Sequence, residues 1–177
     1  MYFDGSKKYD GAGAGVILIS PKGDKLHYVL QMDFKRPTNN EAEYKAILHG
    51  MRMAENCGAT HLMIYGDSNL IVQQTMKDCD VIADNMIAYP DLYNIMERNF
   101  EGCDLRHVGL ESNEEVDLLA NIGSRKGKVL DGVFLECIKQ HSIKQKQPHE
   151  PPPSTPSSHA HLRRTRRHPT HSLLRYY

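Results

Sequence analysis

The chain contains no stretch of apolar residues that reaches the roughly 18 needed for a membrane-spanning helix. It also opens without a signal-peptide pattern, because polar residues begin at Asp4. We therefore expect an intracellular protein that does not contact a membrane, and these features do not distinguish cytoplasm from nucleus.

Cysteine is scarce, and its spacing is not typical of a metal site. None of the four cysteines belongs to a CxxC pair or has a histidine at zinc-ligand spacing. We expect reduced, partly buried thiols rather than a zinc centre or a disulfide framework. The four residues are Cys57, Cys79, Cys103 and Cys137.

An excess of basic charge is also missing, since the formal net charge is zero. The charge is nevertheless uneven along the chain. Residues 1–130 hold 19 acidic and 14 basic side chains, whereas residues 131–177 hold 3 acidic and 8 basic ones. Because nucleic-acid binders usually carry a basic surface, phosphate contact by the first part would need metal ions, locally placed Lys or Arg, or the C-terminal tail.

Composition divides the chain into three parts. Residues 1–128 have the apolar content of one folded domain, 129–143 are predicted to be a linker, and 144–177 are rich in Pro, Ser, His and Arg. The last part has too few apolar residues to fold alone, so we expect a disordered tail. Its cluster Arg163–Arg167 either adds salt-sensitive, non-specific nucleic-acid binding or has no function.

Hydrophobic periodicity predicts an α/β fold. Three strands with short turns suggest an antiparallel meander, and a glycine-rich turn is expected at 10–15. Helices and strands then alternate, which indicates a five-stranded mixed sheet, three antiparallel strands followed by two parallel ones, flanked by helices. Pro90 must kink or restart one of the helices. We expect strands at 1–4, 16–19, 27–34, 61–65 and 103–108, and helices at 40–57, 67–77, 84–100 and 112–122.

Two of these helices begin with a capping-box pattern, Thr38 to Glu41 and Ser112 to Glu115. In the first helix, Glu43 lies at the centre of the small apolar face. An unpaired carboxylate there would be destabilising or would take up a proton, so Glu43 is a functional carboxylate, a helix-edge residue reaching solvent, or the partner of a buried base. The apolar face holds Ala46, Ile47, Gly50 and Ala54, and the charged face holds Glu41, Lys45, Arg52 and Glu55.

Three further carboxylates occupy positions that permit a functional role. Asp67 follows a strand and precedes a helix, Asp4 follows a very short strand, and Asp117 lies in the second turn of the last helix. Each has a plain alternative, as helix cap, turn residue and helix-dipole partner respectively. If all four acids met at one sheet edge, their repulsion would require a cation such as Mg²⁺, which prefers oxygen ligands.

These acids lie within four segments that resemble the acidic motifs of type-1 ribonuclease H, in the same order. The resemblance covers residues 1 to about 125 and is closest to ribonuclease H segments in polyproteins of plant gypsy-class long-terminal-repeat retrotransposons. The segments are Tyr2–Ser6, Thr38–Glu43, Gly66–Ser68 and Asn113–Ala120.

The resemblance implies an endonuclease that hydrolyses the RNA strand of RNA–DNA hybrids, working as a monomer or as part of a polyprotein. Asp4, Glu43, Asp67 and Asp117 would hold two Mg²⁺ ions, with Mn²⁺ as an alternative. His107 stands where the family has a histidine that moves a proton or helps product release. Its alternative role is that of a strand-end histidine hydrogen-bonded to backbone.

The resemblance also assigns a set of residues to the hybrid, whose 2′-hydroxyls distinguish RNA from DNA in the minor groove. Capping and turn formation are the alternative roles of these residues. They are Gly5, Ser6, Asn39, Asn40, Ser68 and Asn69.

Some features depart from the family pattern. The first strand is short, Val116 replaces a usual alanine, and the chain has no tryptophan and no basic segment between its middle helices. Weak affinity for a free hybrid is therefore expected. The competing hypothesis is an inactive or domesticated retroelement fragment that only binds nucleic acid.

Overall fold

The computed structural model describes residues 1–75 and 88–141. Internal contacts divide the chain into Met1–Lys146 and Gln147–Tyr177. The predicted tail 144–177, the end of the helix predicted at 67–77, the start of the one predicted at 84–100, and Cys79 lie outside the described residues. Cys57, Cys103 and Cys137 are free thiols. Cys103 is partly buried, as predicted, but Cys57 and Cys137 are exposed.

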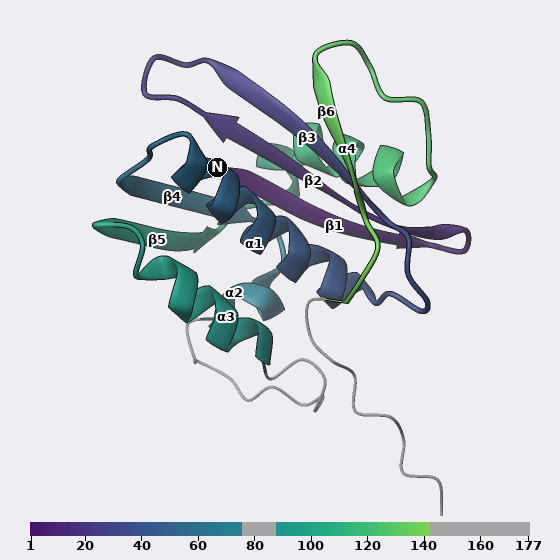
Figure 1. The fold of residues 1–177 in the computed structure, drawn as a ribbon, viewed down its shortest axis with the longest axis horizontal. Coiled ribbons are helices and arrows are strands. Elements are labelled where there is room, and N and C mark those ends of the chain that lie inside the picture. The colour runs from purple at the N-terminus through teal and green to yellow at the C-terminus, as the bar shows by residue number, and fades with distance from the viewer. Residues whose placement is uncertain (76–87, 142–177) are drawn as a thin grey trace, which may run out of the picture. The chain divides into compact units, whose positions relative to one another are not determined.

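A mixed sheet forms the centre of the molecule (Figure 1), with strand order β5-β4-β1-β2-β3-β6. The first three strands form the expected antiparallel meander, and β4 and β5 add to β1 as parallel strands. The strands are β1 (Tyr2–Lys8), β2 (Gly11–Ile19), β3 (Lys25–Met32), β4 (His61–Gly66), β5 (Gly102–His107) and β6 (Val133–Ile138).

The sheet has six strands in the described residues, so the prediction of five was wrong. The additional strand, β6, lies within the segment predicted to be a linker and pairs in parallel with β3, from His27↔Val133 to Met32↔Ile138. Its Phe134 ring stacks on Tyr28 with ring centroids 5.1 Å apart. This strand therefore extends the folded domain beyond the predicted boundary at residue 128.

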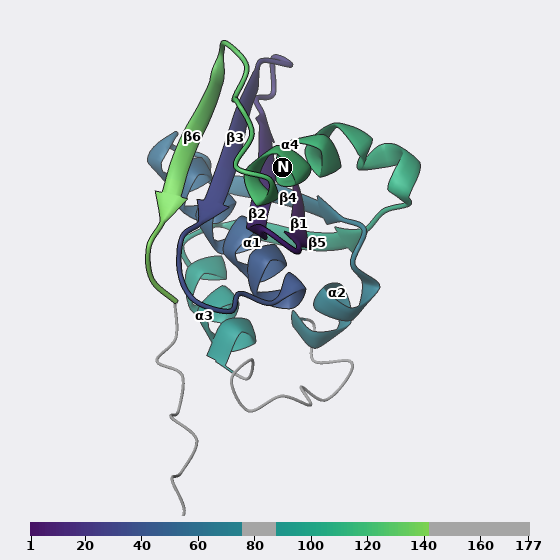
Figure 2. The same ribbon diagram turned by 90° about the vertical axis from the view of Figure 1, so that its right-hand side faces the viewer.

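Helices cover both faces of the sheet (Figure 2): α1 and α3 lie on one side and α4 on the other. No helix in the described part of the chain is long and apolar enough to cross a membrane. Pro90 lies in the first turn of α3, where a missing backbone N–H removes no helical hydrogen bond. The helices are α1 (Asn39–Asn56), α2 (Asn69–Thr75), α3 (Ala88–Glu97) and α4 (Glu114–Ser124).

The segment predicted as a glycine-rich turn is the first half of β2. Its residues alternate between the two faces of the sheet, and Gly15 faces α4. A Cβ added at Gly15 would overlap the Val116 carbonyl oxygen, so the glycine lets the helix backbone lie directly on the strand. The glycines of β2 therefore serve close packing rather than a change of chain direction.

The start of α1 is capped as predicted, because the Thr38 hydroxyl accepts from the Glu41 N–H at 3.1 Å. The second predicted capping box is wrong. Ser112 ends a short 3₁₀ helix (Leu110–Ser112), and α4 follows Asn113, which makes no side-chain cap.

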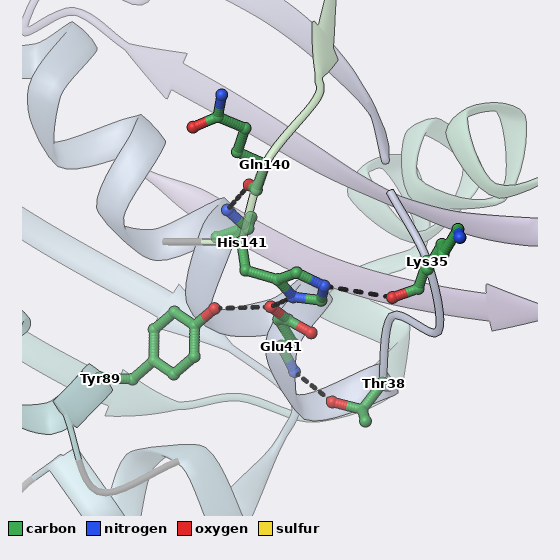
Figure 3. A network of polar contacts seen from close by, with 7 residues as sticks. Lys35, Thr38, Glu41, Tyr89, Gln140 and His141 are labelled. Carbon is green, nitrogen blue, oxygen red and sulfur yellow. Dashed lines mark hydrogen bonds and ion pairs between the residues drawn. The ribbon is translucent and has the colours of Figure 1, made fainter. Parts of the chain in front are cut away.

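The first half of the charged face predicted for α1 is covered, whereas Arg52 and Glu55 are exposed as expected. Glu41 and Lys45 are buried, because the segment after β6 crosses the start of the helix. Figure 3 shows how Glu41 accepts from the Tyr89 hydroxyl at 2.9 Å and pairs with His141 Nδ1 at 2.6 Å. Lys45 Nζ donates to the Gln140 carbonyl at 2.9 Å, and burial lowers the pKa of Lys45 to about 8 although Glu41 opposes the shift.

His141 also contacts the segment between β3 and α1, since its Nε2 lies 3.1 Å from the Lys35 carbonyl oxygen (Figure 3). Further along α1, the buried His49 lies 3.3 Å from the Glu136 carboxylate of β6. Polar contacts thus tie β6 and the residues after it to α1 at two points. We call the contacts of Glu41 and Lys45 with Gln140 and His141 the C-terminal clasp.

Candidate active site

The first acidic side chain lies on a strand with one open edge. β1 pairs with β2 along its whole length but with β4 only at Tyr2↔Tyr65. From Asp4 onward, the edge of β1 opposite β2 is therefore not paired with any strand of the described residues. Asp4 is buried, with 7% of its surface exposed.

Close packing of α1 brings Glu43 to the same place. A Cβ at Gly5 would overlap the backbone nitrogen of Glu43, so only glycine allows α1 to lie this close to β1. Glu43 is buried, as its position on the apolar face predicted. Its Oε1 accepts from Asn39 Nδ2 at 2.7 Å, and the Asn39 Oδ1 accepts from the Lys7 N–H at 3.1 Å.

The other two carboxylates come from opposite sides of β1. Asp67 directly follows β4, and Asp117 lies in α4, whose start is fixed to β1 by the Asn113 amide donating to the Phe3 carbonyl at 3.2 Å. Asn121 Nδ2 donates to Asp117 Oδ1 at 2.8 Å, and the Ser6 hydroxyl donates to Asn121 Oδ1 at 3.2 Å. Asp117 is thus oriented by a neighbour that is itself held by β1.

All four carboxylates line one open pocket of about 320 Å³, together with four of the six residues assigned to the substrate and two lysines. Asn40, Asn69 and His107 do not line it. The pocket residues are Asp4, Gly5, Ser6, Lys7, Lys8, Asn39, Glu43, Asp67, Ser68 and Asp117.

The pocket is unfavourable for negative charge. Burial raises the pKa of Asp4 to about 8, and the charges of Asp67, Asp117 and Glu43 add to the shift while the Gly5 N–H opposes it. Burial likewise raises the pKa of Glu43 to about 7, with Asp67 adding to the shift and hydrogen bonds from Ser68 and Asn39 opposing it. A cation in the pocket would relieve this repulsion.

The donor set fits a hard divalent cation. Glu43 Oε2 is buried and accepts no well-formed hydrogen bond from the described residues, although the Ser68 hydroxyl is near. Within residues 1–75 and 88–141, no three acidic, histidine or cysteine side chains form a group that could hold a metal ion by itself. A Mg²⁺ site does not require one, because this ion uses a few carboxylates and completes its shell with water and substrate oxygens.

His107 ends β5 next to the pocket rather than in it. Its Nε2 lies 3.1 Å from the Asp67 carbonyl oxygen, and its side chain is exposed. This contact matches the alternative role of His107, that of a strand-end histidine hydrogen-bonded to backbone. The ring remains beside the residue that carries one of the pocket carboxylates.

Sequence reasoning missed four residues of the site: Lys7, Lys8, Asn113 and Asn121. The two lysines follow Asp4 on a strand that was expected to end there, so their position on the pocket was not foreseen. Asn113 is 1% exposed. It was counted only as part of a motif, and its contact with β1 joins residues 110 positions apart in the chain.

The sheet order, the helices on both faces and the acidic pocket define a ribonuclease H-like domain. The chain belongs to the reverse transcriptase-like family, whose model matches residues 2–123. The match covers β1 to β5 and most of α4, and thus all four carboxylates.

Individual relatives agree with this assignment. The chain is 28% identical to ribonuclease HI of Halobacterium salinarum over 121 residues, 68% of this chain and 61% of that protein. The crystal structure of RNase H1 from the same archaeon matches with a TM-score of 0.63 and 26% identity, covering 71% of this chain and 96% of the other.

A second curated relative, the uncharacterized protein YpeP of Bacillus subtilis, is 35% identical over 79 residues, 42% of this chain and 35% of that protein. The chain therefore spans less than two thirds of the length of both curated relatives.

Proposed function

We propose that this chain is a metal-dependent endonuclease that hydrolyses the RNA strand of RNA–DNA hybrids. The observation that carries the proposal is the convergence of Asp4, Glu43, Asp67 and Asp117 on one open pocket. Similarity to ribonuclease HI supports the same activity. Folds of one class host many functions, so the proposal depends on these side chains rather than on the sheet.

Two Mg²⁺ ions, or Mn²⁺ in their place, would be held by the four carboxylates. Such ions lower the pKa of an attacking water and stabilise the leaving 3′-oxygen of the RNA. The chain's own contribution is to hold the carboxylates in place: Asn39 orients Glu43, and Asn121 orients Asp117. His107, beside Asp67 and exposed, would accept or deliver a proton at the pocket mouth.

The residues around the carboxylates suit recognition of a hybrid. Ser6, Asn39 and Ser68 offer short polar groups on the pocket wall, and Gly5 adds backbone to the same wall. We propose that these groups contact 2′-hydroxyls in the minor groove, the feature that marks the RNA strand. Asn40 and Asn69, at the starts of α1 and α2, would contact the strands just outside the pocket.

A cleavage assay tests the proposal. The purified chain, incubated with a labelled RNA–DNA hybrid and Mg²⁺, should cut the RNA strand, leaving 5′-phosphate and 3′-hydroxyl ends, and EDTA should stop the reaction. Asp67→Asn should lower the rate by about 100-fold or more, because it removes a ligand charge with little change in shape.

Glu101→Gln is the matched control. It also converts a carboxylate to an amide, but Glu101 precedes β5 at the end of the sheet remote from Asp67, so its rate should equal that of the unaltered chain. Cleavage that survives Asp67→Asn would contradict the proposal.

The second candidate is a retroelement fragment that binds nucleic acid without cutting it. It is favoured because no three of the acidic, histidine or cysteine side chains described in the structure form a group that could hold a metal ion by itself. Hybrid binding without cleavage at any Mg²⁺ or Mn²⁺ concentration would select it. In either case we propose, from the four acidic motifs, an origin in a plant gypsy-class retrotransposon polyprotein and a monomeric or polyprotein-borne state.

A further inference from the structure

The pocket has a basic border that the four-carboxylate site does not explain. β1 continues beyond Asp4 to Lys7 and Lys8, and both lysines line the pocket. Both side chains are exposed, and neither forms an ion pair with any residue of the described part of the chain. In a part of the chain with excess acidic charge, two lysines next to four carboxylates place positive charge where a polyanion must enter.

The turn after these lysines exposes an aromatic ring. Tyr9 stands at the tip of the β1–β2 hairpin and is fully exposed. Exposed aromatic rings that contribute nothing to packing are frequent in binding surfaces, because they add contact area with few rotatable bonds. The three consecutive residues Lys7, Lys8 and Tyr9 form what we call the hairpin tip.

The distance from the carboxylates suits a second contact with the same strand. Lys8 lies four positions beyond Asp4, which is about 13 Å along an extended strand. A nucleic-acid strand rises about 3.4 Å per nucleotide along the duplex axis, so Lys8 lies within a few nucleotides of the one in the pocket. Within residues 1–75 and 88–141, no strand pairs with the edge of β1 between these points.

We propose that the hairpin tip binds the sugar–phosphate backbone of the nucleic acid that enters the carboxylate pocket. The Lys7 and Lys8 ammonium groups would each contact a phosphate, and the Tyr9 ring would lie against a sugar of the same strand. The inference rests on the proposed function, since it takes the occupant of the pocket to be an RNA–DNA hybrid. Under this proposal, the hairpin tip supplies affinity for the hybrid to a domain whose net charge is acidic.

Salt dependence of binding tests the proposal. In an Asp67→Asn background with Mg²⁺, the dissociation constant for a hybrid is measured between 50 and 200 mM salt. Each phosphate contact adds about 0.9 to the slope of log affinity against log salt concentration. Lys7→Ala with Lys8→Ala should therefore reduce the slope by about 1.8.

Lys22→Ala with Arg52→Ala is the control, because it removes the same charge from the β2–β3 turn and from the second half of α1. Its slope should equal that of the background. Tyr9→Ala should weaken binding about fivefold with no change in slope, since the ring is neutral, and Tyr9→Phe should bind normally. Melting temperatures confirm that each variant is folded.

An unchanged slope in the Lys7 and Lys8 variant, or the same loss in the control, would overturn the proposal, as would a hybrid that does not bind at all. Cleavage by the chain with Asp67 intact is measured in parallel. If the chain with Asp67 intact cleaves the hybrid but the Lys7 and Lys8 variant keeps the salt slope of the background, only the role of the hairpin tip is refuted. If that variant has a reduced slope but the chain with Asp67 intact does not cleave, only the nuclease activity is refuted.

Discussion

Asp4 destabilises the metal-free chain at neutral and alkaline pH. Its pKa in the folded protein is about 8, against 3.8 for the unperturbed group, because it is buried beside three other acids. The folded state therefore binds a proton more tightly than the unfolded state. The resulting stability is fully present below about pH 4 and is lost as the pH rises through 8.

Replacing Asp4 by Asn should remove this dependence. Without divalent ions, Asp4→Asn should raise the free energy of unfolding at pH 8 by about 1–3 kcal/mol and should give no gain at pH 4. Urea unfolding at the two pH values measures the difference. Asp131→Asn, the same change at an exposed site, should leave the free energy of unfolding unchanged at both pH values.

Mg²⁺ should reverse the order at pH 8, because a bound cation turns the buried charge into a favourable partner. It should stabilise the unaltered chain more than Asp4→Asn. Equal stability of the two proteins without metal would show that Asp4 is not strained by its neighbours.

Among individual residues, the sequence predicted the four acids better than the residues that orient them. Glu43 is detectable because a carboxylate on an apolar helix face is anomalous in a single helix. Asn121 and Lys7 carry no such anomaly, since their roles arise from contacts with distant segments. No local pattern could therefore identify them.

The C-terminal clasp shows how a polar cluster can fix one element on another. Glu41 is 4% exposed and depends on Tyr89 and His141 for its hydrogen bonds. A buried carboxylate that loses a partner is destabilising, because the remaining charge is neither solvated nor paired.

His141→Ala should accordingly lower the free energy of unfolding by about 1–3 kcal/mol. Glu41→Gln should also be destabilising, and the two changes together should cost less than the sum of the single effects. Chemical denaturation of the four proteins gives this coupling energy. Strict additivity would mean that the two side chains do not interact in solution.

Strand β6 was overlooked because its sequence gives a weak signal. Four of its six residues are exposed, so the apolar patch around Phe134 has no clear two-residue alternation. β2 was misread for a different reason. Its glycines are typical of turns, and only the close approach of α4 explains why they lie in a strand.

At the scale of the whole molecule, residues beyond the predicted boundary at 128 pair with β3 and contact α1. A chain ending at residue 128 would lack β6 and the clasp, leaving the edge of β3 open and His49 and Lys45 without their β6-side contacts. We propose that the folding unit runs to at least His141.

Two shortened chains test this boundary. A chain of residues 1–146 should unfold cooperatively with nearly the stability of the full chain. One of residues 1–128 should be roughly 2–4 kcal/mol less stable, the value expected from losing an aromatic contact and a buried ion pair. Urea titration compares them, and equal stabilities would refute the proposed boundary.

The overall topology was the most predictable part, because long periodic segments determine it. The acidic motifs, read in order, also indicated which elements carry the site. Parts that depend on tertiary contact alone were not foreseen, namely the sixth strand, the burial of Glu41 and Lys45, and the lysines on the pocket.

Glycines in β1 and β2 place the backbones of α1 and α4 directly on the sheet. The separation of Asp4, Glu43 and Asp117 is consequently set by main-chain contact rather than by the sizes of the core side chains. Apolar residues of the core could drift over many generations while these three carboxylates keep their spacing. Mutations would then abolish the site mainly at the acidic residues themselves and at a few glycines.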